Sequence, residues 1–251
     1  MAASDTVRQT FELASTVCSP DFVAGVELEI ENFREFPTTH WNRTEDGSLR
    51  NEGYEYISPP ESRAELVKGF RQIHKTIVLG DKPFTERTSI HVHINMLDLT
   101  QEQVKSVVLW YALFEPVFFS MVDPIRRNNI HCVGLDQTCL SEQYRRTLPL
   151  FVSKWSKYTA LNLLPLQTQG TIEFRHMEGH NDPKKFEEWL CTLENLWTYG
   201  KENRMRKEEL TEEGILKAFD YIFKDAEIKS IRSVVLNTIA DPLLDVKLAL
   251  V

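Results

Sequence analysis

The stretch Gly25–Glu31, GVELEIE, decides the fold that this sequence predicts. Its apolar residues alternate strictly with carboxylates, and a period of two is typical of a half-buried β-strand. The apolar edge consists of Val26, Leu28 and Ile30, and the acidic edge consists of Glu27, Glu29 and Glu31. Successive carboxylates on that edge lie about 6.6–7 Å apart, where unit charges repel by roughly 2–2.5 kcal/mol at an effective dielectric of about 20. The acidic edge must therefore be either solvated or neutralised by cations.

Two later stretches repeat this alternation with complementary chemistry. Thr88–Asn95, TSIHVHIN, carries two histidines on its polar edge, and Thr171–His176, TIEFRH, carries a carboxylate and a guanidinium. Those polar residues are His91, His93, Glu173 and Arg175. If these strands pair with the acidic strand in one antiparallel sheet, the sheet has an apolar back and a polar front with the character of an active-site floor. A shorter strand, Gly53–Ser58, carries Glu55, whose direction depends on strand pairing.

Composition limits the class of protein. A chain of 251 residues with 42% hydrophobic and 26% charged residues is ordinary for one globular domain. The net charge of -8 argues against nonspecific binding to nucleic acid or to anionic membranes. No leader peptide or membrane span is predicted, so we expect a cytoplasmic protein. Four cysteines lack CxxC spacing and are expected to be reduced thiols: Cys18, Cys132, Cys139 and Cys191.

Capping signals predict helices around the strands. A first helix is expected over 4–17, and boxes at Ser62–Glu65 and Thr100–Gln103 open helices that run to about 79 and 115. Pro116 is expected to break or kink the third, although 116–122 can continue helically.

The rest of the chain is expected to be mainly helical. Asp182-Pro183 starts an amphipathic helix, and 211–223 and 225–239 are expected to be helical as well. The predicted class is α+β, with a catalytic domain over 1–200 and a helical extension over 201–251. Asp46-Gly47 is expected to be the turn of a hairpin over 40–51.

A glutamate-rich site with one or two histidines favours hard cations. Mg²⁺ or Mn²⁺ suits such oxygen ligands better than Zn²⁺, which takes ligand sets dominated by Cys and His. Magnesium next to an arginine is typical of sites that handle nucleotide phosphates. The sequence has neither GxxxxGK[ST] nor GxGxxG, so a P-loop or dinucleotide-binding fold is not expected.

Five stretches, in order along the chain, carry a family resemblance: GVELEIE, GYEYISPP, SIHVHIN, KYTALNL and TIEFRH. Over about 21–197 the sequence resembles the amidoligases, which belong with the glutamine synthetase and glutamate–cysteine ligase superfamily of carboxylate–amine ligases. The resemblance implies a curved antiparallel sheet flanked by helices, with Mg²⁺-ATP on its concave face. It also implies that ATP converts a carboxylate to an acyl phosphate, which an amine then attacks to give an amide or isopeptide bond.

The resemblance also implies roles for individual residues. The expected metal ligands are Glu27, Glu29, Glu55, His91 and Glu173. The residues expected to be catalytic are Glu29, Glu173 and Arg175, with the arginine at the transferred phosphoryl group. The expected nucleotide-pocket residues are His93, Arg126, Asn129, Tyr158 and Asn162. Glu31 has no clear counterpart in the family, and we expect it to meet solvent or a salt bridge.

Two other readings of the pattern stay open at this point. A cupin-like enzyme binds iron or zinc through HxH on a strand, but that pattern needs a Glu a few residues later, where this chain offers only Asp98. A ligase fold could also serve as an inactive nucleotide-binding module, against which the intact acidic, His and Arg positions argue. The expected substrates are a carboxylate and an amine on a small molecule, a peptide or a protein.

Overall fold

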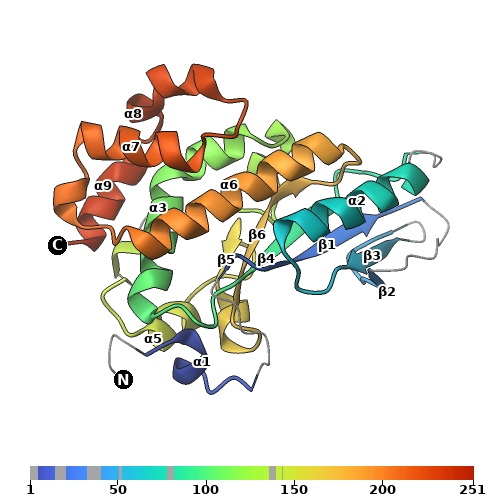
Figure 1. Cartoon of the computed structure of the whole chain (residues 1–251), viewed down its shortest axis with the longest axis horizontal. Coiled ribbons are helices and arrows are strands. Elements are labelled where there is room, and N and C mark those ends of the chain that lie inside the picture. The colour runs from blue at the N-terminus through green and yellow to red at the C-terminus, as the bar shows by residue number, and fades with distance from the viewer. Residues whose placement is uncertain are drawn as a thin grey trace.

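In the computed structural model, which describes residues 5–14, 21–32, 41–50, 53–77, 82–135, 140–142 and 144–251, six strands form one open antiparallel sheet. The strands are β1 (Ala24–Ile30), β2 (Asn42–Thr44), β3 (Tyr54–Ile57), β4 (Ser89–Asn95), β5 (Leu161–Asn162) and β6 (Thr171–Glu178). Their order is β2-β3-β1-β4-β6-β5, which leaves β2 and β5 at the edges. The predicted α+β class, with an antiparallel sheet and flanking helices, is confirmed (Figure 1).

The apolar back of the sheet is the one that the alternation predicts. Val26 and Leu28 are fully buried, and Ile30 is 2% exposed. The neighbouring strands add Ile90, Val92, Ile94, Ile172 and Phe174, all buried. Burying an aliphatic side chain of this size contributes roughly 1.5–3 kcal/mol, so the pattern in β1, β4 and β6 fixes which face meets the helices.

Three long helices cover this apolar face: α2 (Arg63–Ile77), α3 (Gln101–Ser120) and α6 (Pro183–Glu202). Figure 1 shows α2 and α6 lying in front of the strands. Tyr111 of α3 meets Phe174 edge-on with ring centroids 5.6 Å apart. From α6, the Trp197 indole donates to the carbonyl of Asn95 at 3.2 Å. The helices are therefore anchored to β6 and to the end of β4.

The capping signals locate these helices correctly. Thr100 and Gln103 form the full capping box of α3, and the Asp182 carboxylate accepts from two backbone N–H groups at the start of α6. At Pro116 the helix does not break: α3 continues to Ser120, which is the helical continuation that the sequence left open. Its proline lacks an N–H, but its own carbonyl accepts from the Arg127 guanidinium at 3.0 Å.

The two ends of the chain differ most from expectation. The described part of the first helix is only α1 (Val7–Thr10), capped by Thr6, and 4 and 15–17 lie outside the described residues. The helix expected over 225–239 is instead a 3₁₀ turn, η4 (Lys229–Ser233), followed by α8 (Val235–Thr238). Both ends of the hairpin expected over 40–51 also lie outside the described residues. Near β3, the Asp46 carboxylate accepts from the Ser48 N–H at 2.6 Å, which confirms a turn there.

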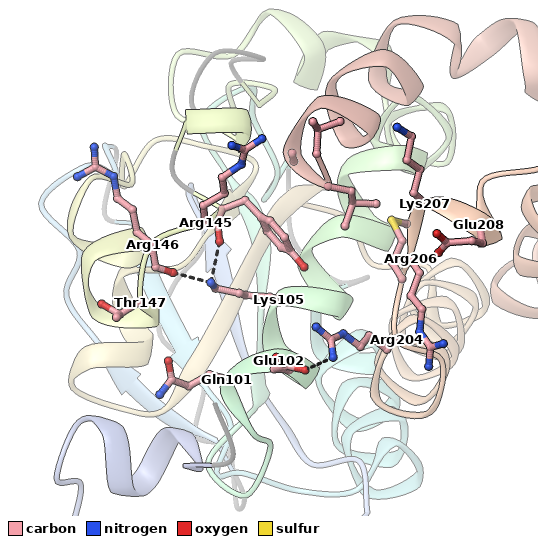
Figure 2. A pocket seen from close by; sticks show the side chains of 15 residues that line it. Gln101, Glu102, Lys105, Arg145, Arg146, Thr147, Arg204, Arg206, Lys207 and Glu208 are labelled. Atoms are coloured by element: carbon pink, nitrogen blue, oxygen red, sulfur yellow. Dashed lines mark hydrogen bonds and ion pairs between the residues drawn. The ribbon is translucent and has the colours of Figure 1, made fainter. Parts of the chain in front are cut away.

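Beyond α6, the chain packs back on the other helices through α7 (Glu212–Ile222) and α9 (Ala240–Ala249). Phe219 of α7 meets Phe114 of α3 edge-on at 6.1 Å. A hollow lies among the start of α3, residues 144–147 and the segment after α6 (Figure 2). The expected division at residue 200 falls near the end of α6 and stays a prediction. The other short elements of the described chain are η1 (Pro124–Asn128), α5 (Leu148–Ser153), η2 (Leu164–Gln167) and η3 (Lys207–Glu209).

Two further expectations concern cysteines and membranes. Cys132 and Cys191 are free, as expected, whereas Cys18 and Cys139 lie outside the described residues. Among the described residues, no helix has the length and apolar character needed to cross a bilayer.

The close approach of α3 and α6 gives a stability test. A Cβ on Gly200 would lie 2.7 Å from the Val107 Cα and 3.0 Å from its backbone N, which cannot move aside as a side chain can. We expect Gly200→Ala to lower the free energy of unfolding by about 1–3 kcal/mol. Chemical denaturation measures it, with Gly47→Ala as control because a Cβ there meets nothing within 4 Å. Helix propensity alone would raise the free energy of unfolding of Gly200→Ala by up to about 1 kcal/mol, and such a rise would contradict this packing.

Candidate metal and nucleotide site

Strand pairing gathers the predicted polar residues on one face. Glu27 lies opposite His91, and Glu29 lies opposite Glu55. His93 lies opposite Glu173. Directly opposed residues of antiparallel strands share a face, so β3, β1, β4 and β6 together carry these groups. The pairing also settles the direction of Glu55, which the sequence left open.

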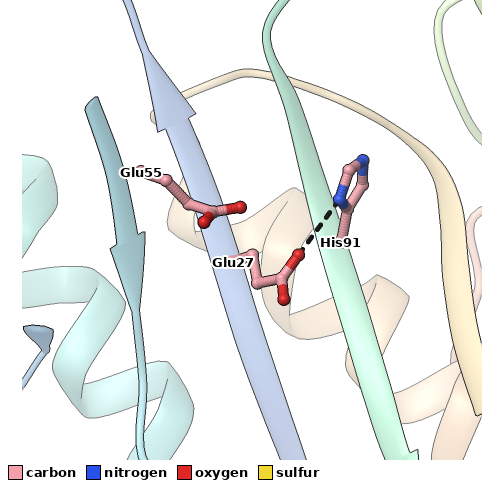
Figure 3. A group of neighbouring side chains, drawn as sticks. All are labelled: Glu27, Glu55 and His91. Atoms are coloured by element: carbon pink, nitrogen blue, oxygen red, sulfur yellow. Dashed lines mark hydrogen bonds and ion pairs between the residues drawn. The ribbon is translucent and has the colours of Figure 1, made fainter. Parts of the chain in front are cut away.

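Glu27 is the centre of the cluster. Its Oε2 lies 3.3 Å from the His91 Nδ1, and its Oε1 lies 3.2 Å from the His93 Nε2. The same His91 nitrogen is 3.3 Å from the Glu173 Oε1. Figure 3 shows Glu55, Glu27 and His91 reaching toward one another from three adjacent strands.

The electrostatics of the two neighbouring carboxyl groups are opposite. Burial favours the neutral form of Glu27, but the close contacts and charges of His91 and His93 outweigh it and hold the pKa of Glu27 well below its usual range. Burial, together with the charges of Glu27 and Glu29, raises the pKa of Glu55 to about 8. Without a cation, Glu55 therefore keeps a proton at neutral pH. Such divergent pKa values are typical of functional sites.

Glu29 is bound at the inner edge of the cluster. Its side chain is buried, and its Oε2 accepts from the N–H and the hydroxyl of Ser89 at 2.7 and 2.6 Å. The same hydroxyl lies 2.8 Å from the His91 Nε2. Ser89 thus links Glu29 to His91 and fixes the ring orientation of the histidine, a role that no sequence pattern signals.

Glu31 leaves the cluster, and its expected salt bridge is confirmed. It is fully buried, and the Arg87 guanidinium donates to both of its oxygens at 3.0 and 2.9 Å. The Arg50 N–H and the Thr85 hydroxyl donate to it at 2.6 and 2.8 Å. Although burial opposes ionisation, these donors lower the pKa of Glu31. Glu31, directly after the end of β1, therefore joins this strand to the segment before β4.

Among the described residues, three overlapping groups of side chains could hold cations, each with ligand atoms within 4.8 Å of one another. The groups are Glu29–Asp46–Glu55, Glu27–Glu55–His91 and Glu27–His93–Glu173. Adjacent groups share one carboxylate, so they form a row across the sheet in which a shared oxygen ligand can bridge neighbouring cations. Asp46 was missed by the sequence analysis, which explained it only as a turn residue.

The donor set fits a hard divalent cation. Each group holds two or three carboxylates and at most one histidine, and oxygen ligands suit Mg²⁺ or Mn²⁺. The His93 Nε2 is buried and makes no hydrogen bond, although it is 3.2 Å from the Glu27 Oε1. This unsatisfied nitrogen makes His93 a candidate ligand, whereas the family resemblance implies that role only for the other histidine of β4, His91.

At the other end of the row, β6 and β5 orient a carboxylate and an arginine. The Asn162 amide donates to the Glu173 Oε2 at 2.7 Å. The Arg175 Nη1 forms a short ion pair with the Glu173 Oε1, and its Nε donates to the carbonyl of His131 at 3.1 Å. Asn162 therefore orients a candidate ligand, and Arg175 is held beside it.

Arg126 supports the strand at this point. The β4–β6 register shifts between Ile90 and Val92, a local irregularity typical of bulges next to functional sites. Arg126 is 2% exposed, and its guanidinium donates to the carbonyls of Arg175 at 2.6 Å and His176 at 2.9 Å. These contacts are to main chain and hold the backbone that carries Arg175. The nucleotide-binding role expected of Arg126 stays a prediction.

The two remaining expected pocket residues lie near His131. Asn129 accepts from the His131 N–H at 2.8 Å. Tyr158 is 42% exposed, and its ring centroid lies 5.4 Å from that of His131. Because the His131 carbonyl accepts from Arg175, both residues belong to the surroundings of that arginine. Their expected contact with nucleotide stays a prediction.

A hollow of about 380 Å³ adjoins the cluster at Glu27 and His93. Gly25 forms part of its floor because it lies opposite His93 and has no side chain. A Cβ there would meet only the Ser58 carbonyl, at 4.0 Å. The other described residues that line the hollow are mainly apolar or uncharged, among them Ile57, Pro60, Leu97, Gln169 and Thr171. The hollow therefore suits an uncharged organic group next to a cation site.

Comparison with known proteins identifies the family to which the chain belongs. Residues 38–197 match the family Amidoligase_2, described as "putative amidoligase enzyme". The match contains β2 to β6 and most of α6, whereas β1 precedes it. No curated protein matches the chain. Because the matched region covers more than half of the 251 residues, the chain belongs to the Amidoligase_2 family.

Proposed function

We propose that this amidoligase is an ATP- and Mg²⁺-dependent carboxylate–amine ligase that works through an acyl phosphate. The observation that carries the proposal is the row of candidate cation sites that share Glu27 and Glu55 and end beside Arg175. A nucleotide triphosphate needs several positive charges along its length. This row offers positions for cations at one end of the sheet and a guanidinium at the other.

The bound Mg²⁺ would neutralise phosphate oxygens and polarise the phosphorus that is attacked. The residues of the chain have separate tasks. The side chains that would hold the cations are Glu27, Glu55, His91, His93 and Glu173. Ser89 orients His91, and Asn162 orients Glu173. Arg175 would stabilise charge on the phosphoryl group in transit, because its fork matches phosphate oxygens.

The proposed reaction balances in two steps. A substrate carboxylate oxygen attacks the γ-phosphorus of ATP, and ADP leaves with the bond electrons. The nitrogen of an amine then attacks the acyl carbon, inorganic phosphate leaves, and the amine loses one proton. The uncharged hollow beside Glu27 and His93 has room for an organic part of one substrate next to the phosphates.

The alternative of a cupin-like enzyme has lost support. Cupins are double-sheet jelly rolls, whereas the described strands form one open sheet. The histidines of β4 also lie among carboxylates from three other strands rather than in a histidine-dominated pocket. An inactive nucleotide-binding module differs from a ligase only in turnover, so the experiments below measure binding and product release together.

The first prediction is that nucleotide binding depends on divalent cations. Calorimetric titration with ATP should show binding with Mg²⁺ or Mn²⁺ and little without, because the carboxylate row repels a bare polyphosphate. ADP release should then require both a carboxylate and an amine from screening libraries. Equal ATP affinity in excess chelator would contradict the proposed cation sites. Tight ATP binding without ADP release across the libraries would favour the inactive nucleotide-binding module.

The second prediction concerns Glu55 and pH. Its pKa in the folded protein is raised from 4.5 to about 8, so the stability it contributes is present below its unfolded pKa and is lost as pH rises through its folded pKa. The metal-free wild type should therefore lose stability across this window relative to Glu55→Gln, whose amide carries no charge. Denaturation in chelator from about pH 5 to about pH 9 measures the difference.

The same variant tests cation binding. Mg²⁺ must displace the proton of Glu55, so titration in buffers of different ionisation enthalpy should report proton release that Glu55→Gln lacks. Glu45→Gln serves as control, because that carboxylate lies on the chain next to Asp46 but belongs to none of the candidate groups. In the pH experiment, a difference in the free energy of unfolding between the wild type and Glu55→Gln that stays constant at all pH values would contradict the raised pKa of Glu55.

The third prediction concerns Arg175. If its fork stabilises the phosphoryl group, Arg175→Lys should keep most Mg²⁺-ATP affinity and lower turnover by roughly 10²–10³-fold. Arg87→Lys is the matched control, because it loses the same fork at a buried carboxylate outside the row. If Arg175 only pairs with Glu173, turnover should stay near that of the wild type while the thermal midpoint falls. Measuring both quantities on each variant separates the two roles.

A further inference from the structure

A second charged feature lies away from the carboxylate row. The hollow of about 820 Å³ at the start of α3 shares no lining residue with the candidate metal groups. Its cationic lining residues are Lys105, Arg145, Arg146, Arg204, Arg206 and Lys207, and its acidic side chains are Glu102 and Glu208. Figure 2 shows Arg145 and Arg146 on one side and Arg204, Arg206 and Lys207 on the other. Such a concentration of cations stands out in a chain of net charge -8.

Two of these cationic side chains already have interaction partners within the protein. Arg204 pairs with Glu102 at 2.5 Å, and the Lys105 ammonium donates to the carbonyls of Tyr144 and Arg146 at 2.7 and 2.5 Å. For the other four, no hydrogen bond or ion pair of the side chain occurs within the part of the chain that the structure describes. All four are exposed: Arg145, Arg146, Arg206 and Lys207. Their charge is therefore available to a ligand.

The arginine segment is held in place by the body of the protein. Lys105 is fixed between the carbonyls that flank Arg145, and the Gln101 Oε1 accepts from the Leu148 N–H at 3.2 Å. The Tyr144 ring lies over the Lys105 ammonium at 5.1 Å. The backbone of the two free arginines is thus anchored to the first turns of α3 before any ligand arrives, which reduces the entropy lost on binding.

The hollow also has an apolar side. Tyr144, Met205 and Leu250 line it together with Val251, which is 72% exposed. On α9, the helix that ends at this hollow, Leu244 is 62% exposed and Leu248 is 58% exposed. Those two residues are four apart and share a helix face. Unlike scattered surface apolar residues, these leucines lie on a helix whose last residue, Ala249, lines the cationic hollow, which suggests a partner that is both acidic and apolar.

We propose that this surface, the hollow with the exposed leucines of α9, docks an acidic amphipathic segment of another protein. Guanidinium groups pair with carboxylates through bidentate hydrogen bonds, and Leu244 and Leu248 would pack against the apolar face of the segment. A flat anionic membrane would not enter a concave hollow. Long nucleic acid would meet the repulsion of the net negative protein beyond this surface.

The experiment measures anisotropy of a short fluorescent peptide, with leucines at i, i+3, i+4 and i+7 and glutamates elsewhere. A scrambled peptide of the same composition separates amphipathic pattern from charge. Arg145→Glu/Arg146→Glu removes the cations, and Leu244→Ser/Leu248→Ser removes the apolar stripe. Lys75→Glu/Lys217→Glu is the control with the same charge change, since both lysines are exposed elsewhere, on α2 and α7. Circular dichroism checks that each variant is folded.

We expect binding that weakens with salt and falls at least about tenfold in each surface variant, as hot-spot truncations typically give, while the control retains it. Equal binding of the scrambled peptide, of inorganic polyphosphate or of phosphatidylserine vesicles would overturn the proposal in favour of a nonspecific anion surface. Absence of peptide binding to the wild type would overturn it as well. ATP binding and ADP release are independent of this assay, so its failure leaves the proposed ligase function standing.

Discussion

The register of β1 between β3 and β4 is the constraint on which the site depends. It sets Glu27 against His91 and Glu29 against Glu55. Since side chains alternate along a strand, a slip of one residue would move every carboxylate into the core and every core residue to the surface. The buried Val26 and Leu28 therefore specify the chemistry of the opposite face as firmly as the acidic residues themselves.

The three carboxylates of the acidic edge are each stabilised by different partners. Glu27 is balanced by two histidines, Glu29 by the N–H and hydroxyl of Ser89, and Glu31 by a bidentate arginine. Only the last has a full opposite charge fixed by the fold. Burial and the remaining repulsion from Glu27 and Glu29 raise the pKa of Glu55. A cation would relieve that repulsion, which is why the polar face is suited to bind one.

Much of this arrangement was predictable from local patterns. Alternation located β1, β4 and β6 and both faces of the sheet, because hydrophobic burial and the strand period act residue by residue. Contacts between distant segments were not predictable in this way. Asp46 joins Glu29 only through the β2–β3 pairing, and Arg126 reaches the carbonyl of His176 fifty residues along the chain. Neither short-range spacing nor residue type signals such pairs.

The central place of β1 has a consequence for how the chain can be divided. The region that matches the family starts at residue 38, after β1 has ended at Ile30. A polypeptide cut back to that region would keep the β2–β3 hairpin and the β4–β6–β5 group, but it would lose the strand that bonds to both. Two unpaired edges would replace one continuous sheet, and such edges favour association with other chains. Folding and aggregation resistance thus depend on a segment that the family match leaves out.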